Sequence, residues 1–342
     1  MELTINNRVF SLFNNVRVAL QYDSVASTFE FELFFDPDNL DEKELFEPGR
    51  YWPATVSHNG QLLITGTMLS LGFSDDAESA LVSVAGYSKT GVLEDCDIPN
   101  SSYPLQSNGL SLLDIARKVI KEFDIDIVVD PSVADKMNAH FDVSTADDKQ
   151  SIKDYLTEIT SQRHIIMSHN ERGELVFTSA SPDMVPVFNF QKGMPGIKMS
   201  LDFDGQGMHS EITIKRQQTK RGKGVSGMNT VKNSYCQAFR PKASRQTSGE
   251  VVNVPDVARN ALSDELRGMT VKIEMEGWEL NNKLVVPNTI VSVLNPNIYI
   301  YKRANLFIQA VEYKGGESGQ GATLTCMIPE VFTDGTPINI FK

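Results

Sequence analysis

Cysteine is scarce in this sequence, and its arrangement excludes the usual cysteine-built sites. Cys96, Cys236 and Cys326 are odd in number, far apart and free of CxxC spacing. We therefore expect buried, reduced thiols rather than a zinc site or a disulfide framework. The sequence also lacks a run of about 18 apolar residues, which a membrane-spanning helix would need. No basic segment followed by an apolar run opens the chain, so we predict no secretory signal and expect synthesis in a cytoplasm.

Motifs of catalysis are missing as well. The segment 88–91 has no upstream GxxxxGK pattern, which excludes a phosphate-binding loop, and no GxSxG nucleophile motif occurs. The histidines show no HExxH or HxxxH spacing; they are His58, His140, His164, His169 and His209. We therefore predict no catalysis, no metal and no cofactor.

Two pairs of acids and one pair of histidines are the remaining candidates for chemistry. Asp75-Asp76 and Asp147-Asp148 lie in turn-like polar stretches. Paired acids can run glycosidase chemistry, but adjacent acids in loops are typically solvated, so we predict no hydrolase activity. His164 and His169 flank a predicted turn, for which a solvated conformation is the favoured interpretation.

The length of 342 residues exceeds one ordinary core and predicts two to four domains. An apolar content of 41% and a charged content of 22% are typical of a folded globular protein.

Basic side chains are concentrated in one segment. From residue 212 to 249 there are nine Lys or Arg and no acid. They are Lys215, Arg216, Lys220, Arg221, Lys223, Lys232, Arg240, Lys242 and Arg245. Because the whole chain carries −12 and this segment +9, the remainder carries −21. The asymmetry indicates a local anionic or acidic partner. The alternative is a solvated, mobile loop, which Gly222, Gly224 and Gly227 favour.

The first 91 residues predict a small closed β-barrel. Apolar residues alternate over 16–20 and 28–35, and 81–86 adds a further strand. Asn59-Gly60 lies between two such runs and predicts a tight type I′ hairpin, because both residues accept positive φ angles.

Residues 92–185 predict an α+β insert. Ser111 with Asp114 three residues later approximates a capping box, and the apolar spacing that follows predicts a helix over 111–123. A second helix is predicted over 151–160, a strand over 125–129 and a hairpin around 169–173.

The remainder returns mainly to β signals. Strands are predicted within 186–214 and 270–342, and a helix over 256–266. Near the C-terminus, apolar residues alternate over 306–313 and 322–328, with a Gly-rich tip at 315–321 between them, which predicts a long hairpin. The expected fold class is mainly β with an α+β insert.

Several short segments, in this order along the chain, resemble the phage Mu-like central baseplate hub proteins, a contractile-tail family with T-even hub-like members. They are 86–96 (GYSKTGVLEDC), Gly173-Glu174-Leu175, Arg240-Pro241-Lys242, Gly277-Trp278 and Pro287-Asn288. The predicted helices 111–123 and 151–160 are similar to those of the family's insert. The resemblance covers nearly the whole chain.

The resemblance implies two tube-protein-like β-barrels plus smaller α+β domains. We expect the first barrel from 1–91 and 186–214, the α+β insert from 92–185, and the second barrel, with a basic loop and a helix, from 215–342. It implies a homotrimeric ring in the tail baseplate of a virion, assembled in the host cytoplasm. The ring would join the tail tube protein to the central spike protein and meet the tape-measure protein. DNA would pass only in transit, through an acidic lumen.

Three sets of residues are the candidate sites. The nine cations of 215–245 are expected to dock a protein partner. Strand 28–35 and the tip 315–321 are expected to form protomer contacts, through Phe29, Phe31, Gly315, Gly316, Gly319 and Gly321. The structural anchors are expected to be Gly86, Trp278, Pro287 and Asn288.

Two alternatives stay open. One is the hub of a phage-derived contractile injection system. The other is a tail-associated cell-wall hydrolase or binding module, which would need a cleft with two converging carboxylates.

Overall fold

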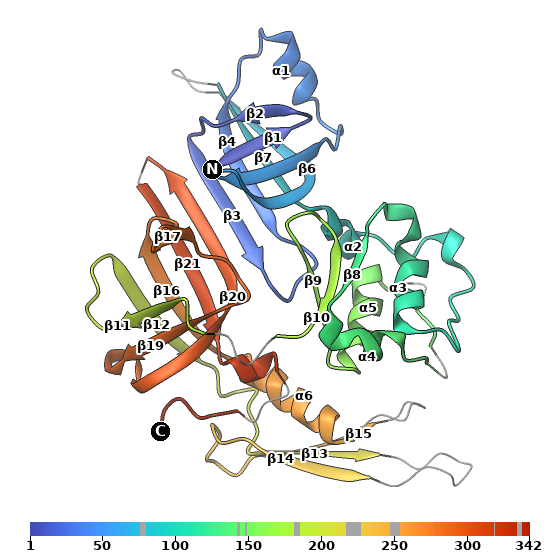
Figure 1. The fold of residues 1–342 in the computed structure, drawn as a ribbon. Coiled ribbons are helices and arrows are strands. Elements are labelled where there is room, and N and C mark those ends of the chain that lie inside the picture. Colours follow the sequence, from blue (N-terminus) through green and yellow to red (C-terminus); the bar gives the residue numbers. More distant parts are fainter. Residues whose placement is uncertain are drawn as a thin grey trace.

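One large sheet, a compact α+β insert and a small three-stranded sheet make up the protein (Figure 1). The computed structural model describes residues 1–75, 80–141, 144–147, 149–180, 185–216, 227–246, 254–317, 319–333 and 337–342. Strands dominate and the helices lie mostly in the insert, so the predicted class, mainly β with α+β parts, is confirmed.

The N-terminal strands form one half of the large sheet. They are β1 (Glu2–Ile5), β2 (Arg8–Phe10), β3 (Asn15–Gln21), β4 (Thr28–Phe34), β5 (Pro53–His58), β6 (Gln61–Asp75) and β7 (Ala80–Ser88), with helix α1 (Leu40–Leu45) after β4. The predicted hairpin joins β5 to β6, where Asn59 and Gly60 have φ angles of 49° and 78°. Both angles are positive, as a type I′ turn requires, so this prediction is confirmed.

The α+β insert has its own core. Its elements are α2 (Val92–Asp95), α3 (Leu112–Ile120), β8 (Ile127–Val129), α4 (Ala134–Asn138), α5 (Ile152–Ser161), β9 (Ile166–His169) and β10 (Leu175–Thr178). Ser111 and Ser151 cap α3 and α5, and each side chain accepts a 3.1 Å hydrogen bond from the backbone N–H three residues later. α3 therefore begins at its predicted cap, and α5 begins one residue after the predicted start of its helix.

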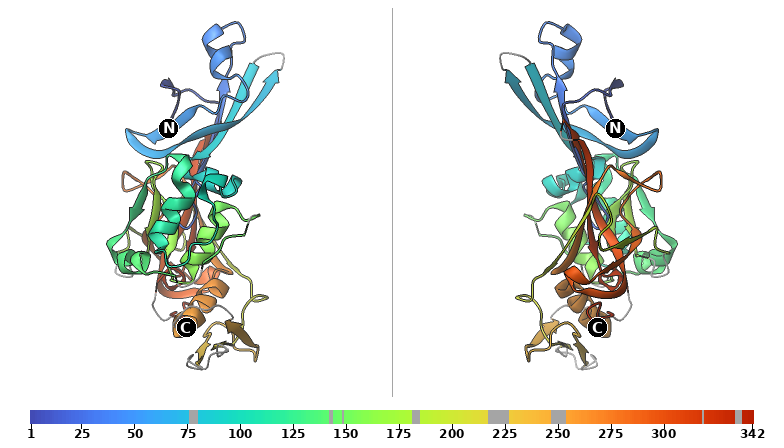
Figure 2. Two further views of the ribbon diagram at one scale, coloured as in Figure 1. Left: turned by 90° about the vertical axis from the view of Figure 1, so that its right-hand side faces the viewer. Right: turned by 90° about the vertical axis from the view of Figure 1, so that its left-hand side faces the viewer.

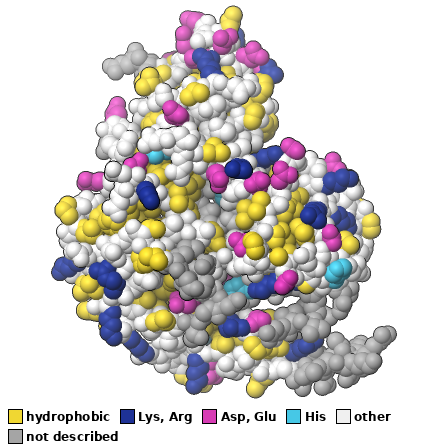
Figure 3. Space-filling view, in the orientation of Figure 1, with side chains coloured by type: hydrophobic (Ala, Val, Ile, Leu, Met, Phe, Trp, Pro, Cys, Tyr) yellow, Lys and Arg dark blue, Asp and Glu magenta, His cyan; other side chains and the backbone are white. Residues whose placement is uncertain are grey.

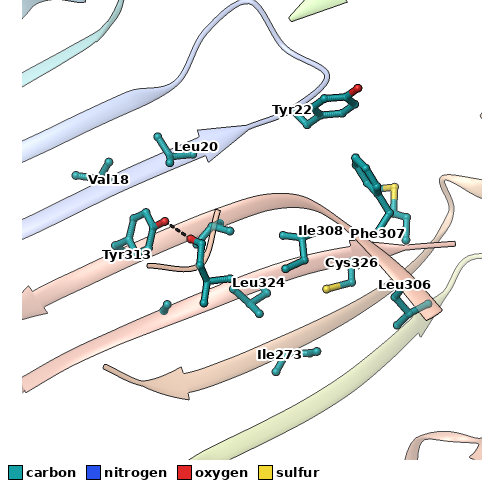
Figure 4. Close-up of a cluster of buried hydrophobic side chains, with 14 of the residues drawn as sticks. Val18, Leu20, Tyr22, Ile273, Leu306, Phe307, Ile308, Tyr313, Leu324 and Cys326 are labelled. Atoms are coloured by element: carbon teal, nitrogen blue, oxygen red, sulfur yellow. Dashed lines mark hydrogen bonds between the residues drawn. The ribbon is translucent and has the colours of Figure 1, made fainter. Parts of the chain in front are cut away.

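The C-terminal half of the large sheet contains β11 (Phe188–Gln191), β12 (Ile197–Phe203), β16 (Met269–Glu276), β19 (Thr289–Asn295), β20 (Ile300–Gly316) and β21 (Gly319–Met327). β17 (Glu279–Leu280) and β18 (Lys283–Leu284) form a separate small hairpin. Side chains of β16, β20 and β21 meet in the core, where the Tyr313 hydroxyl donates to the Val285 carbonyl (Figure 4). Each large apolar side chain buried here contributes about 1.5–3 kcal/mol.

The strand partners of 186–214 differ from those that the predicted domain division implied. β11 pairs in parallel with β19, and β12 pairs antiparallel with β16, so both complete the C-terminal half rather than the N-terminal barrel. Alternation along a strand identifies its buried face but not its neighbour, which explains the difference.

The two halves form one continuous sheet through β3 and β20. β20 is 17 residues long; its first part pairs with β19, and Ala310 to Gly316 pair with β3. The order across the sheet is β12-β16-β21-β20-β3-β4-β7-β6-β5-β1-β2.

The described part of the expected basic loop, together with the predicted strand before it, forms a second, smaller sheet. β13 (Glu211–Arg216) lies between β14 (Met228–Lys232) and β15 (Pro241–Gln246), and α6 (Val254–Leu266) packs on it. Ile212 and Ile214 are buried in this contact. We call β13, β14 and β15 the basic sheet. It lies at the opposite end of the molecule from α1 in every view (Figure 2).

Candidate functional site

The large sheet has one polar face that runs across six adjacent strands. Alternation puts Val16, Phe31 and Leu324 toward the core, while the residues between them face away from it. The strand register aligns the charged residues of this face as Lys198 and Asp202, Lys272, Glu274 and Glu276, Glu312 and Lys314, Arg17, and Glu30 and Glu32. Six acids thus oppose four bases on this surface, which we call the polar sheet face.

A groove of about 960 Å³ follows the middle of the polar sheet face. On its walls Arg17 pairs with Glu312, and Lys314 lies 3.4 Å from the second oxygen of the same carboxylate. Glu32 accepts 2.6 Å hydrogen bonds from the side chains of Asn14 and Asn15. The groove is therefore a broad trough of mixed charge with an excess of acids, which suits a contact or passage surface.

Of the expected protomer-contact residues, the two phenylalanines are buried, whereas Gly316 and Gly319 lie at the end of the hairpin. Phe29 and Phe31 are 2% and 0% exposed, because they occupy the core face of β4. β4 and β20 are also flanked by strands on both sides, so their hydrogen-bonding edges are occupied. Gly315 faces the core; Gly316 and Gly319 form the end of the hairpin, and Gly321 lines the groove. The edge-pairing role predicted for 28–35 is therefore wrong.

Two of the predicted anchors, Gly86 and Trp278, occupy close-packed positions, whereas Pro287 is half-buried and Asn288 is exposed. A Cβ on Gly86 would lie 2.1 Å from the Thr67 carbonyl oxygen, so this strand position needs glycine. Trp278 is 3% exposed and donates a 2.8 Å hydrogen bond from Nε1 to the Lys314 carbonyl. Asn288, after Pro287, takes a φ of 61° and donates its N–H to Ile308.

The structure divides the nine predicted docking cations into three groups. Lys220, Arg221 and Lys223 lie outside the described residues. Arg240 donates to the carbonyls of Gly205 and Gln206 at 2.8 and 2.7 Å, and Lys242 lies 3.1 Å from Glu265. The remaining four are on strands of the basic sheet: Lys215, Arg216, Lys232 and Arg245.

The turn between β3 and β4 is a junction that no signal in the sequence indicated. Val25 at its tip is 0% exposed and belongs to the core of the insert. Asp23 pairs with Arg267 at the end of α6 and accepts a 2.5 Å hydrogen bond from Gln309 of β20. Residues 22–27 of the large sheet therefore contact both the insert and the end of α6, the helix that packs on the basic sheet.

His169 joins the insert to this turn, which corrects its expected place in a solvated turn. Its Nδ1 lies 2.7 Å from the Ser24 carbonyl and its Nε2 lies 2.8 Å from the Ser27 hydroxyl. A carbonyl only accepts, so Nδ1 carries the proton and Nε2 accepts from Ser27. Burial lowers the pKa of His169 from its ordinary value, while the hydrogen bond to the Ser24 carbonyl and the charge of Glu94 oppose that shift.

We expect His169 to make the protein less stable in mild acid. Below pH 6.5 the unfolded chain binds a proton that native His169 resists, so the free energy of unfolding falls as pH falls. The slope from one such group is at most about 1.4 kcal/mol per pH unit. Denaturant unfolding at pH 7.5 and 5.5 should show a smaller pH effect in His169→Gln than in the native chain. His140→Gln, at an exposed histidine, is the control and should keep the native pH effect.

Neither the two acid pairs nor the histidine pair gains support as a site of chemistry. Within the described ranges, no group of three or more His, Cys, Asp or Glu side chains could hold a metal ion. Asp76 and Asp148, one member of each predicted acid pair, lie outside those ranges. No helix among the described residues is long and apolar enough to cross a membrane.

Comparison with known proteins agrees with the resemblance drawn from the sequence. The family described as "Mu phage baseplate assembly protein GpP, fourth domain" matches residues 257–335, and "Baseplate hub protein gp44-like, second domain" matches 90–179. Baseplate hub protein gp44 of Escherichia phage Mu is 26% identical over 326 residues, which cover 90% of this chain and 82% of the Mu protein.

Solved structures show the same fold. The 43 kDa tail protein of prophage MuSo2 from Shewanella oneidensis has a TM-score of 0.79 at 20% identity, covering 97% of this chain and 99% of that one. A type VI secretion component of E. coli, described as similar to T4 tail proteins gp27 and gp5, has a TM-score of 0.56 at 9% identity, covering 100% and 80%. This chain is thus related to the Mu-like baseplate hub proteins, as its sequence predicted.

Proposed function

We propose that this protein is the central baseplate hub of a contractile phage tail, a homotrimeric ring without catalysis that joins the tail tube to the central spike. The sequence match to the Mu hub over most of the chain carries the proposal. The hub of a phage-derived injection system is the second candidate, because the fold is shared with a type VI secretion component. The expected two tube-like barrels, the partners and assembly in the host cytoplasm remain part of the proposal.

Two free strand edges support a ring. Among the described residues, β12 pairs with β16 alone, and β6 beyond Met68 pairs with β7 alone. These edges terminate the run β12-β16-β21-β20-β3-β4-β7-β6. Residues 69–75 and Ile197–Phe203 are equal in length, at seven residues each. Edge-to-edge association between copies would extend the sheet and occupy both exposed edges.

The apolar face of the sheet is also incomplete at these two edges. Phe73 and Phe203 are 49% and 43% exposed, although their strand partners Val82 and Met269 are 0% and 1% exposed. A neighbouring copy at each edge would cover these aromatic rings. In such a ring we place the polar sheet face toward the lumen, where its mixed charges would limit adhesion of DNA in transit.

Oligomeric state is the experiment that tests this proposal most directly. We expect light scattering to give the mass of three chains and electron microscopy to give a three-fold ring with a central channel. A monodisperse monomer at micromolar concentration would contradict the ring. Turnover of purified cell wall by the chain would instead favour the hydrolase alternative.

A further inference from the structure

The outward face of the basic sheet carries two cations, Lys215 and Arg245, that make no ion pair with any residue that the structure describes. Ile212 and Ile214 of β13 point toward α6, so Thr213 and Lys215 point outward. The register places Lys215 between Met228 of β14 and Arg245 of β15. Met228 is 68% exposed, so an apolar side chain lies beside the two cations.

Arg240 and Lys242 stabilise the fold through contacts within the chain, whereas the two outward cations make no ion pair with the described residues. Arg240 and Lys242 are engaged by backbone carbonyls and by Glu265. For Lys215 and Arg245, no ion pair is found among the described residues. Like charges on neighbouring strands repel one another. Repulsion between Lys215 and Arg245 therefore lowers the stability of the isolated chain, and an anionic partner would offset this repulsion.

We propose that this outward face docks an acidic protein surface of another tail component; the inference rests on the proposed function. The partner would place carboxylates against Lys215 and Arg245 and an apolar group against Met228. Charge complementarity of this kind sets orientation and register between subunits. The location fits, because the basic sheet lies at one end of the molecule, opposite α1 (Figure 1).

Protein is the favoured partner over DNA for two physical reasons. The chain has a net charge of −12, so most of its surface repels phosphate. Binding of single strands also needs aromatic platforms, and of the two aromatics between 227 and 246, Tyr235 is only 8% exposed. Its hydroxyl donates a 2.6 Å hydrogen bond to the Ile338 carbonyl, which leaves Phe239 alone exposed.

A paired-charge variant tests the docking face. Lys215→Thr with Arg245→Thr removes the cations and keeps residues that favour strands. Lys283→Thr with Lys302→Thr is the matched control, since both are exposed strand lysines outside the basic sheet. We expect both variants to keep the native oligomeric mass and melting temperature. Incorporation into sedimented tail particles should fall at least tenfold for the first variant only.

A photo-crosslinking residue in place of Thr213, at the centre of this face, tests the contact without removing charge. We expect a covalent product with an acidic protein of the tail particle, abolished when Lys215 and Arg245 are replaced. A product with DNA, the absence of a product, or normal incorporation of the double variant would each overturn the docking role. Failure of the native chain to form trimers or to enter tails would instead count against the hub itself. If the double variant does not fold, the crosslink decides.

Discussion

Replacing Gly86 by alanine is expected to unfold the N-terminal half of the large sheet. A Cβ at this position would lie 2.1 Å from the Thr67 carbonyl oxygen and 2.5 Å from Cζ of Phe29. Neither can retreat easily, because Thr67 is backbone of β6 and Phe29 is 2% exposed in the core. We expect a loss of more than about 3 kcal/mol of unfolding free energy, the upper range for overpacking.

Gly72→Ala is the matched control for this prediction. Gly72 lies on β6, the neighbour of β7, but a Cβ there would meet only the Ser83 Cβ, at 3.6 Å, an ordinary contact. Alanine has less freedom to lose than glycine in a strand, so this change should be neutral or stabilising by about 0.5–1 kcal/mol. Urea unfolding of both variants gives the measurement. Equal stability of the two would contradict the close-packing role of Gly86.

Local signals in the sequence predicted the elements well because each depends on a few neighbouring residues. Asn59-Gly60 supplies two positive φ angles, and Ser111 and Ser151 supply hydroxyls that cap a helix. Whether this turn and these helix caps form does not depend on what packs against them. The family resemblance could likewise be seen in the sequence alone, because short contiguous segments carry it.

Strand partners and contact surfaces could not be predicted in this way. The alternation of Phe29 and Phe31 identified a buried face, but their proposed role required that face to be outside. Ile212 and Ile214 lie in a predicted strand, but residues 215–245 were expected to be a loop because of their glycines and cations. The pairing of β14 and β15 with β13, and the contact of β13 with α6, depend on partners distant in sequence.

The junction at the β3–β4 turn escaped prediction because its residues are unremarkable in sequence. Ser24, Ser27 and His169 gain importance from contacts across more than 140 positions. The charge imbalance, by contrast, was visible at once and survives in the structure as an outward face of the basic sheet. The surface of the molecule elsewhere intersperses acids and bases, as the upper part of Figure 3 illustrates.

Replacing Phe73 by glutamate is expected to dissociate the proposed trimer. The ring of Phe73 is 49% exposed in one chain and lies at the free edge of β6, where we place the neighbouring copy. Burying a carboxylate without a partner costs several kcal/mol. A closed trimer repeats the same interface three times, so the cost applies at each contact. We expect the variant to elute as a folded monomer at concentrations where the native chain is trimeric.

The half-exposed state of Phe73 is what makes this variant informative. In the isolated chain its replacement leaves the buried Val82 and Val84 of β7 paired with β4, so circular dichroism and melting temperature should change little. Phe239→Glu is the control, since Phe239 is 84% exposed and lies far along the chain in the basic sheet's β14–β15 connection. It should remain trimeric in light scattering. A trimeric Phe73→Glu protein would place the protomer contact on another surface, and a monomeric native protein would remove the ring altogether.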